Sequence, residues 1–340
     1  MTAIFSSLQN DRDKGKKPLL DRVYDENTQK GLRATLDFIE PFTSMEQLEK
    51  RAAEFSGVDI MFSTWGHPEL SESQIREFFP RLKYIFYGAG TVQYFARPFF
   101  ACGVRIFSAA DANSVPVVEY CLAQILLCNK GFYQATAMYS SGDFAASREY
   151  SSMFPGNYGE YLGIIGAGKI GRGVIKALKP YRLNIMVFDP FLSRESADSL
   201  GVKLCGLDEI FEKCSVISNH LANNDQTQGI LNYSHFSKMR PLATFINTGR
   251  GAQVVEKDLV QALNEVPTRT AVLDVTWPEP CTDQHPFFRM KNVFLSPHIA
   301  GSIGDETARM GEFMADEWEA LRDGKPPLYE VTLEMLETMA

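Results

Sequence analysis

The sequence lacks a long apolar run of the kind that marks a membrane-spanning helix. No stretch approaches the roughly 20 consecutive apolar residues that a bilayer crossing needs, and we expect no signal peptide and no membrane association. Positive charge is also in deficit, because 34 Lys and Arg stand against 42 Asp and Glu, giving a net charge of −8. This balance argues against nucleic-acid binding. The short basic run at 14–17 is more typical of a solvated loop than of a binding arm.

Cysteine pairs with metal-ligand spacing are absent as well. The six cysteines form no C-x-x-C motif, and several lie in apolar segments, where Cys behaves as a small hydrophobe. We therefore expect reduced thiols in a cytoplasmic protein and no metal site. The 340 residues, 45% of them hydrophobic, are enough for two domains with ordinary cores.

One set of glycines has the spacing of a dinucleotide-binding motif. Gly166, Gly168 and Gly171 follow the apolar run LGII in G-x-G-x-x-G order, and a helical pattern then leads to a second apolar run ending at Asp189. In a dinucleotide-binding βαβ unit, the three glycines allow the tight turn, close approach of the pyrophosphate and helix–strand packing. The N–H groups at the helix start then face the phosphates. A purely structural glycine turn is the alternative.

Asp189 predicts which dinucleotide binds. It lies 18 residues after Gly171, close to the spacing expected for an acid that accepts hydrogen bonds from the adenosine ribose hydroxyls. This favours NAD, because the 2′-phosphate of NADP would meet a like charge. Arg194 weakens this preference for NAD, since a mobile loop could let it pair with that phosphate.

Alternating strand and helix patterns predict an α/β protein with mostly parallel sheets. Predicted strands cover 3–6, 35–39, 59–63, 84–87 and 104–107 in the first part, and 162–165, 185–188, 215–219, 243–247, 271–275 and 293–296 in the second. Predicted helices cover 25–32, 44–55 with Ser44 as cap, 72–79, 113–130 with Asn113 or Ser114 as cap, 207–213, 257–263 and 305–321, and residues 133–158 are predicted to form an irregular arm.

Two loops of the first part are candidate ligand sites, because they follow predicted strands. One contains Trp65. The other, Gly88-Ala89-Gly90, could offer backbone N–H groups to a carboxylate as an anion nest. Each could equally be an ordinary turn, and His67 by itself is more typical of a loop residue than of a catalyst.

Three polar side chains follow late strands. Arg250, Glu279 and His298 should converge at one sheet edge, because parallel strands end on the same side, where the glycine turn also lies. Arginine binds a carboxylate through two charge-assisted hydrogen bonds. Histidine exchanges protons near neutral pH, and a neighbouring carboxylate fixes its orientation. The set predicts hydride transfer between a dinucleotide and a 2-hydroxy or 2-oxo acid.

Asp274 interrupts the apolar run AVLDV and needs a hydrogen-bond partner, because unpaired burial is costly. The carboxamide of nicotinamide would supply a donor. The alternative is a structural hydrogen bond to a helix amino terminus.

On these residues the chain resembles the D-isomer-specific 2-hydroxyacid dehydrogenases over nearly its full length. The matching segments are GIIGAGKIG, VFDP, MRPLATFINTGRG, LDVTWPEP and SPHIAG. The resemblance implies a homodimer in which a flavodoxin-like substrate domain, 1–112 plus 306–340, carries an inserted Rossmann-like NAD-binding domain, 113–305. It implies that Arg250 binds the substrate carboxylate and that His298, paired with Glu279, is the general acid/base.

The same reasoning gives a set of expected contacts. Coenzyme contacts are expected from Gly166, Gly168, Lys169, Ile170, Gly171, Asp189, Asn223, Thr227, Thr248, Gly249, Asp274 and Gly301. Substrate contacts are expected from Trp65, Gly88, Ala89, Gly90 and Arg250. The chain departs from the family at 220–227, where HLANNDQT lacks the proline and first threonine of H-x-P-x-T-x-x-T. This departure leaves the fit around the adenosine open.

Two other functions are compatible with this fold. An NAD(H)-sensing regulator or corepressor on the same fold is the main alternative, although the complete Arg–Glu–His set counts against it. A formate dehydrogenase is disfavoured, because formate dehydrogenases resemble members of the family that have glutamine at the position of Glu279 in this chain.

Overall fold

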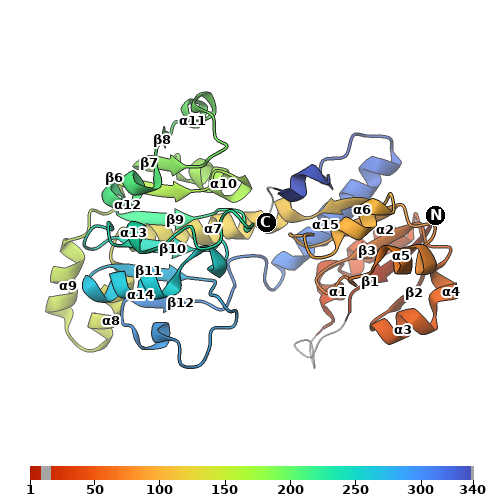
Figure 1. The fold of residues 1–340 in the computed structure, drawn as a ribbon, viewed down its shortest axis with the longest axis horizontal. Helices are drawn as coiled ribbons and strands as arrows, with labels where there is room; N and C mark the ends of the chain where they lie inside the picture. Colours follow the sequence, from red (N-terminus) through yellow and green to blue (C-terminus); the bar gives the residue numbers. More distant parts are fainter. Residues whose placement is uncertain (9–16, 338–340) are drawn as a thin grey trace. The chain divides into compact units, whose positions relative to one another are not determined.

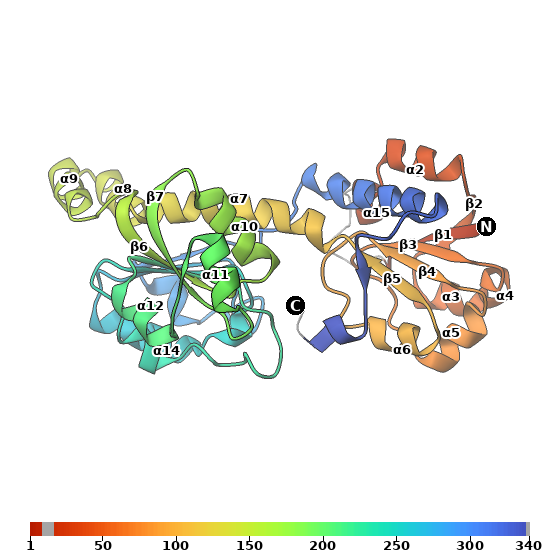
Figure 2. The same cartoon turned by 90° about the horizontal axis from the view of Figure 1, so that it is seen from above.

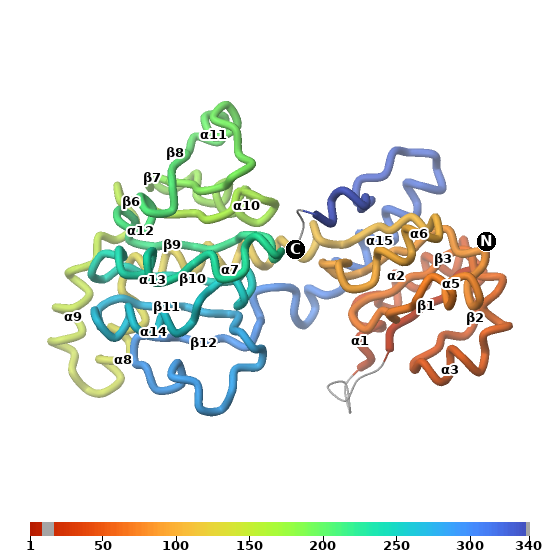
Figure 3. Tube along the Cα trace, viewed as in Figure 1, coloured from red at the N-terminus to blue at the C-terminus, as the bar shows by residue number. Residues whose placement is uncertain are grey.

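The computed structural model describes residues 1–8 and 17–337 of the chain. Most of the basic run predicted at 14–17 lies outside the described residues. Two compact units are present: a first unit formed by Met1–Asn113 with Ser302–Ala340, and a second unit formed by Ser114–Gly301. The colours of Figures 1 and 3 show that the first unit contains both ends of the sequence, and the second its middle.

The first unit is a six-stranded sheet with the order β13-β5-β4-β3-β1-β2, in which only β13 is antiparallel. Its strands are β1 (Thr2–Ser6), β2 (Asp37–Phe42), β3 (Ile60–Ser63), β4 (Tyr84–Tyr87), β5 (Arg105–Ser108) and β13 (Glu330–Val331). Its helices are α1 (Leu19–Val23), α2 (Glu26–Arg33), α3 (Met45–Lys50), α4 (Ala52–Phe55), α5 (Glu72–Phe78), α6 (Ala96–Ala101), α15 (Glu306–Arg322) and η4 (Glu334–Glu337).

Helices cover both faces of this sheet (Figure 2). On the face of α15, the rings of Phe62, Phe86 and Phe107 stack across neighbouring strands at 5.1 and 4.8 Å, and Trp318 packs over Phe86. Such cross-strand aromatic contacts stabilise a sheet beyond simple burial. The strand order 2-1-3-4-5 is flavodoxin-like, as predicted.

The second unit is a seven-stranded parallel sheet with the order β12-β11-β10-β9-β6-β7-β8. Its strands are β6 (Tyr158–Ile165), β7 (Arg182–Phe188), β8 (Lys203–Leu204), β9 (Val216–Asn219), β10 (Thr244–Asn247), β11 (Thr270–Leu273) and β12 (Val293–Leu295). Its helices are α8 (Phe132–Ser140), α9 (Phe144–Ser152), α10 (Lys169–Leu178), α11 (Arg194–Leu200), α12 (Leu207–Lys213), α13 (Tyr233–Phe236), α14 (Glu256–Glu265), η2 (Gly251–Gln253) and η3 (Pro286–Arg289), and α7 (Ala110–Cys128) runs into it from the first unit.

This order places the topological switch point between β6 and β9, which is where ligands bind in doubly wound sheets. The predicted pair of doubly wound α/β sheets is therefore confirmed. The glycine turn follows β6, and Arg250 and His298 follow β10 and β12, so all of them lie at the carboxyl edge of one sheet.

Two local predictions were wrong, and one strand was missed. Helix α7 begins at Ala110 rather than after a cap at Asn113 or Ser114. The Asn113 side chain instead accepts a hydrogen bond from Ser302 N–H. The segment 133–158 is not irregular but forms α8 and α9, the latter capped by Asp143 through Ala146 N–H. The tail adds an unpredicted strand, β13, beside β5.

Among the residues that the structure describes, no helix is both long and apolar enough to cross a membrane.

Candidate active site

The glycine turn has the geometry of a phosphate cradle. Gly166 has a φ of 93°, and a Cβ there would lie 2.8 Å from the backbone of His220. A Cβ on Gly171 would lie 2.0 Å from the Gly166 carbonyl oxygen, so helix α10 can approach the turn only without a side chain at this position. The Cβ position of Gly168 faces open space, which leaves room for a ligand beside the first turn of α10.

Asp189 is fixed at the end of β7 against this turn. Its Oδ2 accepts a hydrogen bond from Ala167 N–H at 2.7 Å, and its Oδ1 accepts one from Phe191 N–H at 2.8 Å. Each carboxylate oxygen retains acceptor capacity for a ribose hydroxyl. Arg194, five residues further on, begins α11 and is exposed. The turn, the open space at Gly168 and the oriented acid together fit a bound dinucleotide.

His298 and Glu279 form a direct pair. Nδ1 of His298 lies 2.6 Å from Oε1 of Glu279, and the two side chains are 45% and 37% exposed, so a substrate can reach them. The backbone of His298 has a φ of 54°, a left-handed conformation that is unusual outside glycine. Its N–H donates to the Asp274 carbonyl oxygen at 3.0 Å.

Arg250 follows the end of β10, which pairs with β11, the strand that precedes Glu279. One of its terminal N–H groups, on Nη1, donates to the Gly249 carbonyl oxygen at 2.8 Å. Burial lowers the pKa of Arg250, while the negative charge of Glu279 acts in the opposite direction. The structure therefore brings Arg250, Glu279 and His298 together at one edge, one pair by direct contact and Arg250 within electrostatic range of Glu279.

Asp274 anchors the loop that carries His298. Its Oδ1 accepts from Ser296 Oγ at 2.6 Å and Ile299 N–H at 2.8 Å, and its Oδ2 accepts from Ala300 N–H at 2.9 Å. These donors belong to the loop after β12 rather than to a helix start. The helix amino terminus of the structural alternative is not among these donors, and the contact with the nicotinamide carboxamide stays a prediction.

Sequence reasoning missed a second anchor in this region, Glu256. Its Oε1 accepts from Trp277 N–H at 2.8 Å, and its Oε2 lies 3.1 Å from Nε2 of His285. Burial raises the pKa of Glu256 and lowers that of His285, which favours a neutral imidazole donating to the carboxylate. These contacts hold both ends of the segment that contains Glu279. Glu256 directly precedes the predicted helix 257–263, and its partners in another segment leave no signal in the sequence.

The loop after β9 carries the expected adenosine contacts. The hydroxyl of Thr227 donates to the Ala222 carbonyl oxygen at 2.7 Å, so it holds the loop's own turn. Asn223 Oδ1 and both ring nitrogens of His220 are buried without a hydrogen-bond partner among the described residues. Burial lowers the pKa of His220 to about 4. Thr248, also expected at the coenzyme, contacts Cys121 Sγ at 3.2 Å.

The two candidate loops of the first unit offer fewer free backbone N–H groups and less exposed side-chain surface than predicted. The N–H groups of Gly88 and Ala89 donate to the carbonyl oxygens of Ser63 and Tyr87, so they are not free to form an anion nest. Trp65 is partly buried against the core.

His67 is a core residue. It is buried, its Nδ1 lies 2.8 Å from Ser63 Oγ, and its ring centroid is 3.9 Å from that of Phe95. Burial lowers its pKa to about 3, which agrees with the view that it is not a catalyst.

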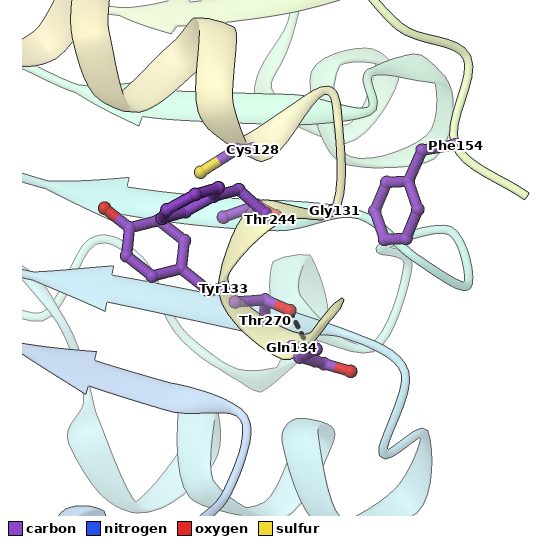
Figure 4. Close-up of a pocket in the computed structure, with 8 residues that line it drawn as sticks. Cys128, Gly131, Tyr133, Gln134, Phe154, Thr244 and Thr270 are labelled. Atoms are coloured by element: carbon purple, nitrogen blue, oxygen red, sulfur yellow. Dashed lines mark hydrogen bonds between the residues drawn. The ribbon is translucent and has the colours of Figure 1, made fainter. Parts of the chain in front are cut away.

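A pocket in the second unit lies away from this site (Figure 4). It is lined by Thr244 and Thr270, the first residues of β10 and β11, and by residues of α8 such as Gln134, whose Nε2 donates to Thr270 Oγ1 at 2.7 Å. The amino edge of the sheet is opposite the edge that carries Arg250. The pocket therefore has no part in the candidate active site.

Comparison with known proteins identifies the class. Residues 122–300 match the model of the D-isomer specific 2-hydroxyacid dehydrogenase, NAD binding domain. The chain belongs to this family, and its coenzyme is a nicotinamide adenine dinucleotide. Glyoxylate reductase of Aeropyrum pernix is 34% identical over 179 residues, 53% of each protein.

A longer relative and a solved structure extend the comparison. D-3-phosphoglycerate dehydrogenase of Methanocaldococcus jannaschii is 31% identical over 226 residues, which are 66% of this chain and 42% of that protein. The chain thus spans about two fifths of the length of such relatives. A phosphoglycerate oxidoreductase from Rhizobium etli has the same fold, with a TM-score of 0.79, 21% identity, and coverage of 98% of this chain and 99% of that one.

Proposed function

We propose that this chain is an NAD-dependent D-2-hydroxyacid dehydrogenase that reduces a 2-oxo acid, or oxidises the corresponding D-2-hydroxy acid. The observation that carries the proposal is the 2.6 Å contact between His298 and Glu279. It lies at the same sheet edge as Arg250 and the glycine turn of an NAD-binding domain. An acid/base, an arginine and a dinucleotide cradle are the parts that this reaction needs.

When bound, the coenzyme supplies or accepts the hydride. Arg250 binds the substrate carboxylate, because its planar guanidinium matches the two carboxylate oxygens. His298 donates a proton from Nε2 to the carbonyl oxygen during reduction and takes it back during oxidation. Glu279 accepts a hydrogen bond from Nδ1, which fixes the tautomer and the ring orientation.

Asp189 makes NAD the preferred coenzyme. Two backbone N–H groups hold its carboxylate at the end of β7, where it accepts hydrogen bonds from the adenosine ribose and repels a 2′-phosphate. The turn Gly166–Gly171 would hold the pyrophosphate. Further contacts come from the predicted set: Asn223, Thr227, Thr248, Gly249, Asp274 and Gly301.

Trp65 and the 88–90 turn are the residues of the first unit to which we assign substrate contacts. Because the N–H groups of Gly88 and Ala89 already have acceptors, Gly90 is the main backbone donor that we assign to the substrate. The relatives named for glyoxylate and 3-phosphoglycerate indicate which acids to try first.

A cytoplasmic homodimer is the assembly that we propose. Large apolar side chains are exposed along α8, α9 and the start of β6, namely Phe132, Tyr139, Phe144, Met153 and Tyr158. Several large apolar side chains exposed on successive elements are the feature that we assign to a subunit interface. Light scattering of the purified protein tests the oligomeric state, and a monomeric mass would contradict the homodimer.

The activity is tested by mixing the protein with NADH and a panel of 2-oxo acids while following NADH absorbance. We expect turnover of at least one acid, with NADH preferred to NADPH. Tight NADH binding with no turnover of any acid would contradict the enzyme and favour an NAD(H)-sensing regulator.

A further inference from the structure

Gln253 lies at the centre of a buried network of amides beneath the candidate site. It belongs to η2, directly after Arg250, and is 0% exposed. All of its polar capacity is used. Its Oε1 accepts from Asn219 Nδ2 at 2.6 Å and from Arg250 N–H at 3.2 Å, and its Nε2 donates to the carbonyl oxygens of Leu221 at 2.8 Å and Ala222 at 2.9 Å.

Two asparagines complete the network. Asn219 ends β9 and donates to Asn247 Oδ1 at 3.0 Å, while its own Oδ1 accepts from Leu221 N–H at 3.3 Å. Asn247 ends β10, accepts from Gly249 N–H at 3.1 Å and donates to the Arg250 carbonyl oxygen at 3.2 Å. Three buried side-chain amides therefore connect two strand ends to two loops.

The two loops belong to different parts of the reaction. One carries Arg250, the carboxylate binder of the proposed function. The other, residues 220–222, passes directly behind the glycine turn, since a Cβ on Gly166 would lie 2.8 Å from the backbone of His220. Gly249 completes the fit, because a Cβ there would lie 2.7 Å from Gln253 Oε1.

We infer that Gln253 is a positioning residue that couples Arg250 to the coenzyme-binding turn, so that coenzyme binding orders the arginine for the substrate carboxylate. The coupling runs through the amide: one end holds the backbone N–H of Arg250 and the other holds the loop behind Gly166. A buried network whose members are all satisfied is rigid and transmits a displacement at one end to the other. This inference rests on the proposed function.

Gln253→Met tests it, because methionine has a similar length and removes both polar ends. The carbonyl oxygens of Leu221 and Ala222 and the N–H of Arg250 then lose their partner. We expect the KM of the best 2-oxo acid to rise about tenfold or more, since Arg250 is no longer held in place and binds the substrate carboxylate less tightly. The matched control is Gln261→Met on the exposed face of α14, which should behave as the wild type.

A second measurement does not depend on turnover. Hydrogen exchange of the peptides around 219–223 and 247–253 is compared with and without NADH. In the wild type we expect NADH to slow exchange in both segments. In Gln253→Met we expect it to slow exchange in 219–223 only, although NADH still binds. If the wild type turns over no 2-oxo acid, the proposed function fails while this exchange pattern still decides the coupling.

Gln253→Glu separates the two ends of the amide. A carboxyl group can still accept from Asn219 and Arg250, but it can donate to Leu221 or Ala222 only while protonated. The hydrogen-bond partners of residue 253 are the Asn219 amide and backbone groups. None of these groups titrates between about pH 5 and 9. We expect its kcat/KM to approach the wild-type value at acidic pH and to fall as the pH rises, relative to the wild-type profile.

Each outcome decides the inference. Equal KM values and equal exchange patterns in Gln253→Met and Gln261→Met would overturn it. If Gln253→Met does not fold, the pH profile of Gln253→Glu decides, and a wild-type profile overturns the coupling. If neither variant folds, Gln253 is structural and the inference is wrong.

Discussion

Replacing Asp274 by alanine should weaken both the fold of the second unit and the reaction. Its carboxylate accepts three hydrogen bonds, from Ser296 Oγ, Ile299 N–H and Ala300 N–H, at 2.6 to 2.9 Å. Hydrogen bonds to a charged group contribute about 1.5–3 kcal/mol each. The three are not additive, because the loop relaxes and water enters, so we expect a loss of about 3–5 kcal/mol, less than the sum of the three.

The structure also gives the expected kinetic effect. His298 lies in this loop, and its N–H donates to the Asp274 carbonyl oxygen. Without the carboxylate the loop is no longer fixed, and small misplacements of a catalytic group reduce the rate by up to about a hundredfold. We therefore expect kcat to fall by at least about tenfold at a temperature where the variant is folded.

Urea unfolding followed by circular dichroism, with loss of NADH binding as a reporter of the second unit, measures the stability. Asp198→Ala, an exposed carboxylate in α11, is the matched control and should stay within about 0.5 kcal/mol of the wild type. Equal unfolding midpoints for the two variants would refute the anchoring role. A destabilised Asp274→Ala with unchanged kcat would refute the link to His298.

Three further substitutions test other parts of the site. His298→Ala should lower kcat by about 10²–10⁴-fold while NADH affinity stays within about twofold, measured by turnover and fluorescence titration; unchanged turnover would exclude the acid/base role. Gly166→Ala should weaken NADH binding at least about tenfold, because its φ of 93° and the nearby His220 backbone leave no room for a Cβ, whereas Gly206→Ala, with open space, should not. His220→Leu should reduce the loss of folding stability that acid causes. Burial lowers the pKa of His220 to about 4 in the folded protein. The wild-type imidazole therefore contributes stability above about pH 6.5 that is lost as the pH falls toward 4. Equal acid limbs in urea unfolding at several pH values would contradict this.

Much of the fold could be predicted from local patterns. Apolar runs of β-branched and aromatic residues bounded by polar ones set the strands of both sheets, and β4 was predicted at its observed limits, Tyr84–Tyr87. Ser44 caps a helix as predicted, because the acceptor side chain and the helix start are adjacent in sequence. Asp25 was predicted as the first helical residue and instead caps α2. The site followed from one rule, that parallel strands end at a common edge.

The missed elements depend on contacts that are distant in sequence. Helices α8 and α9 are rich in Ser, Tyr and Ala and show little amphipathic periodicity, so composition alone indicated a loop, although Asp143 was an available capping signal. Strand β13 forms only by pairing with β5, more than 200 residues away. Gln253 and Glu256 are ordinary polar residues in the sequence, and their roles depend on partners in other loops.

The most direct test of the account is the transfer of deuterium from NADH deuterated at C4 to a 2-oxo acid. The product is analysed by mass spectrometry for deuterium at C2 and by chiral chromatography for its configuration. The account predicts a D-2-hydroxy acid that carries deuterium at C2, formed by the wild type at least about a hundredfold faster than by His298→Ala. A product without deuterium, an L-2-hydroxy acid, or equal formation by His298→Ala would contradict it.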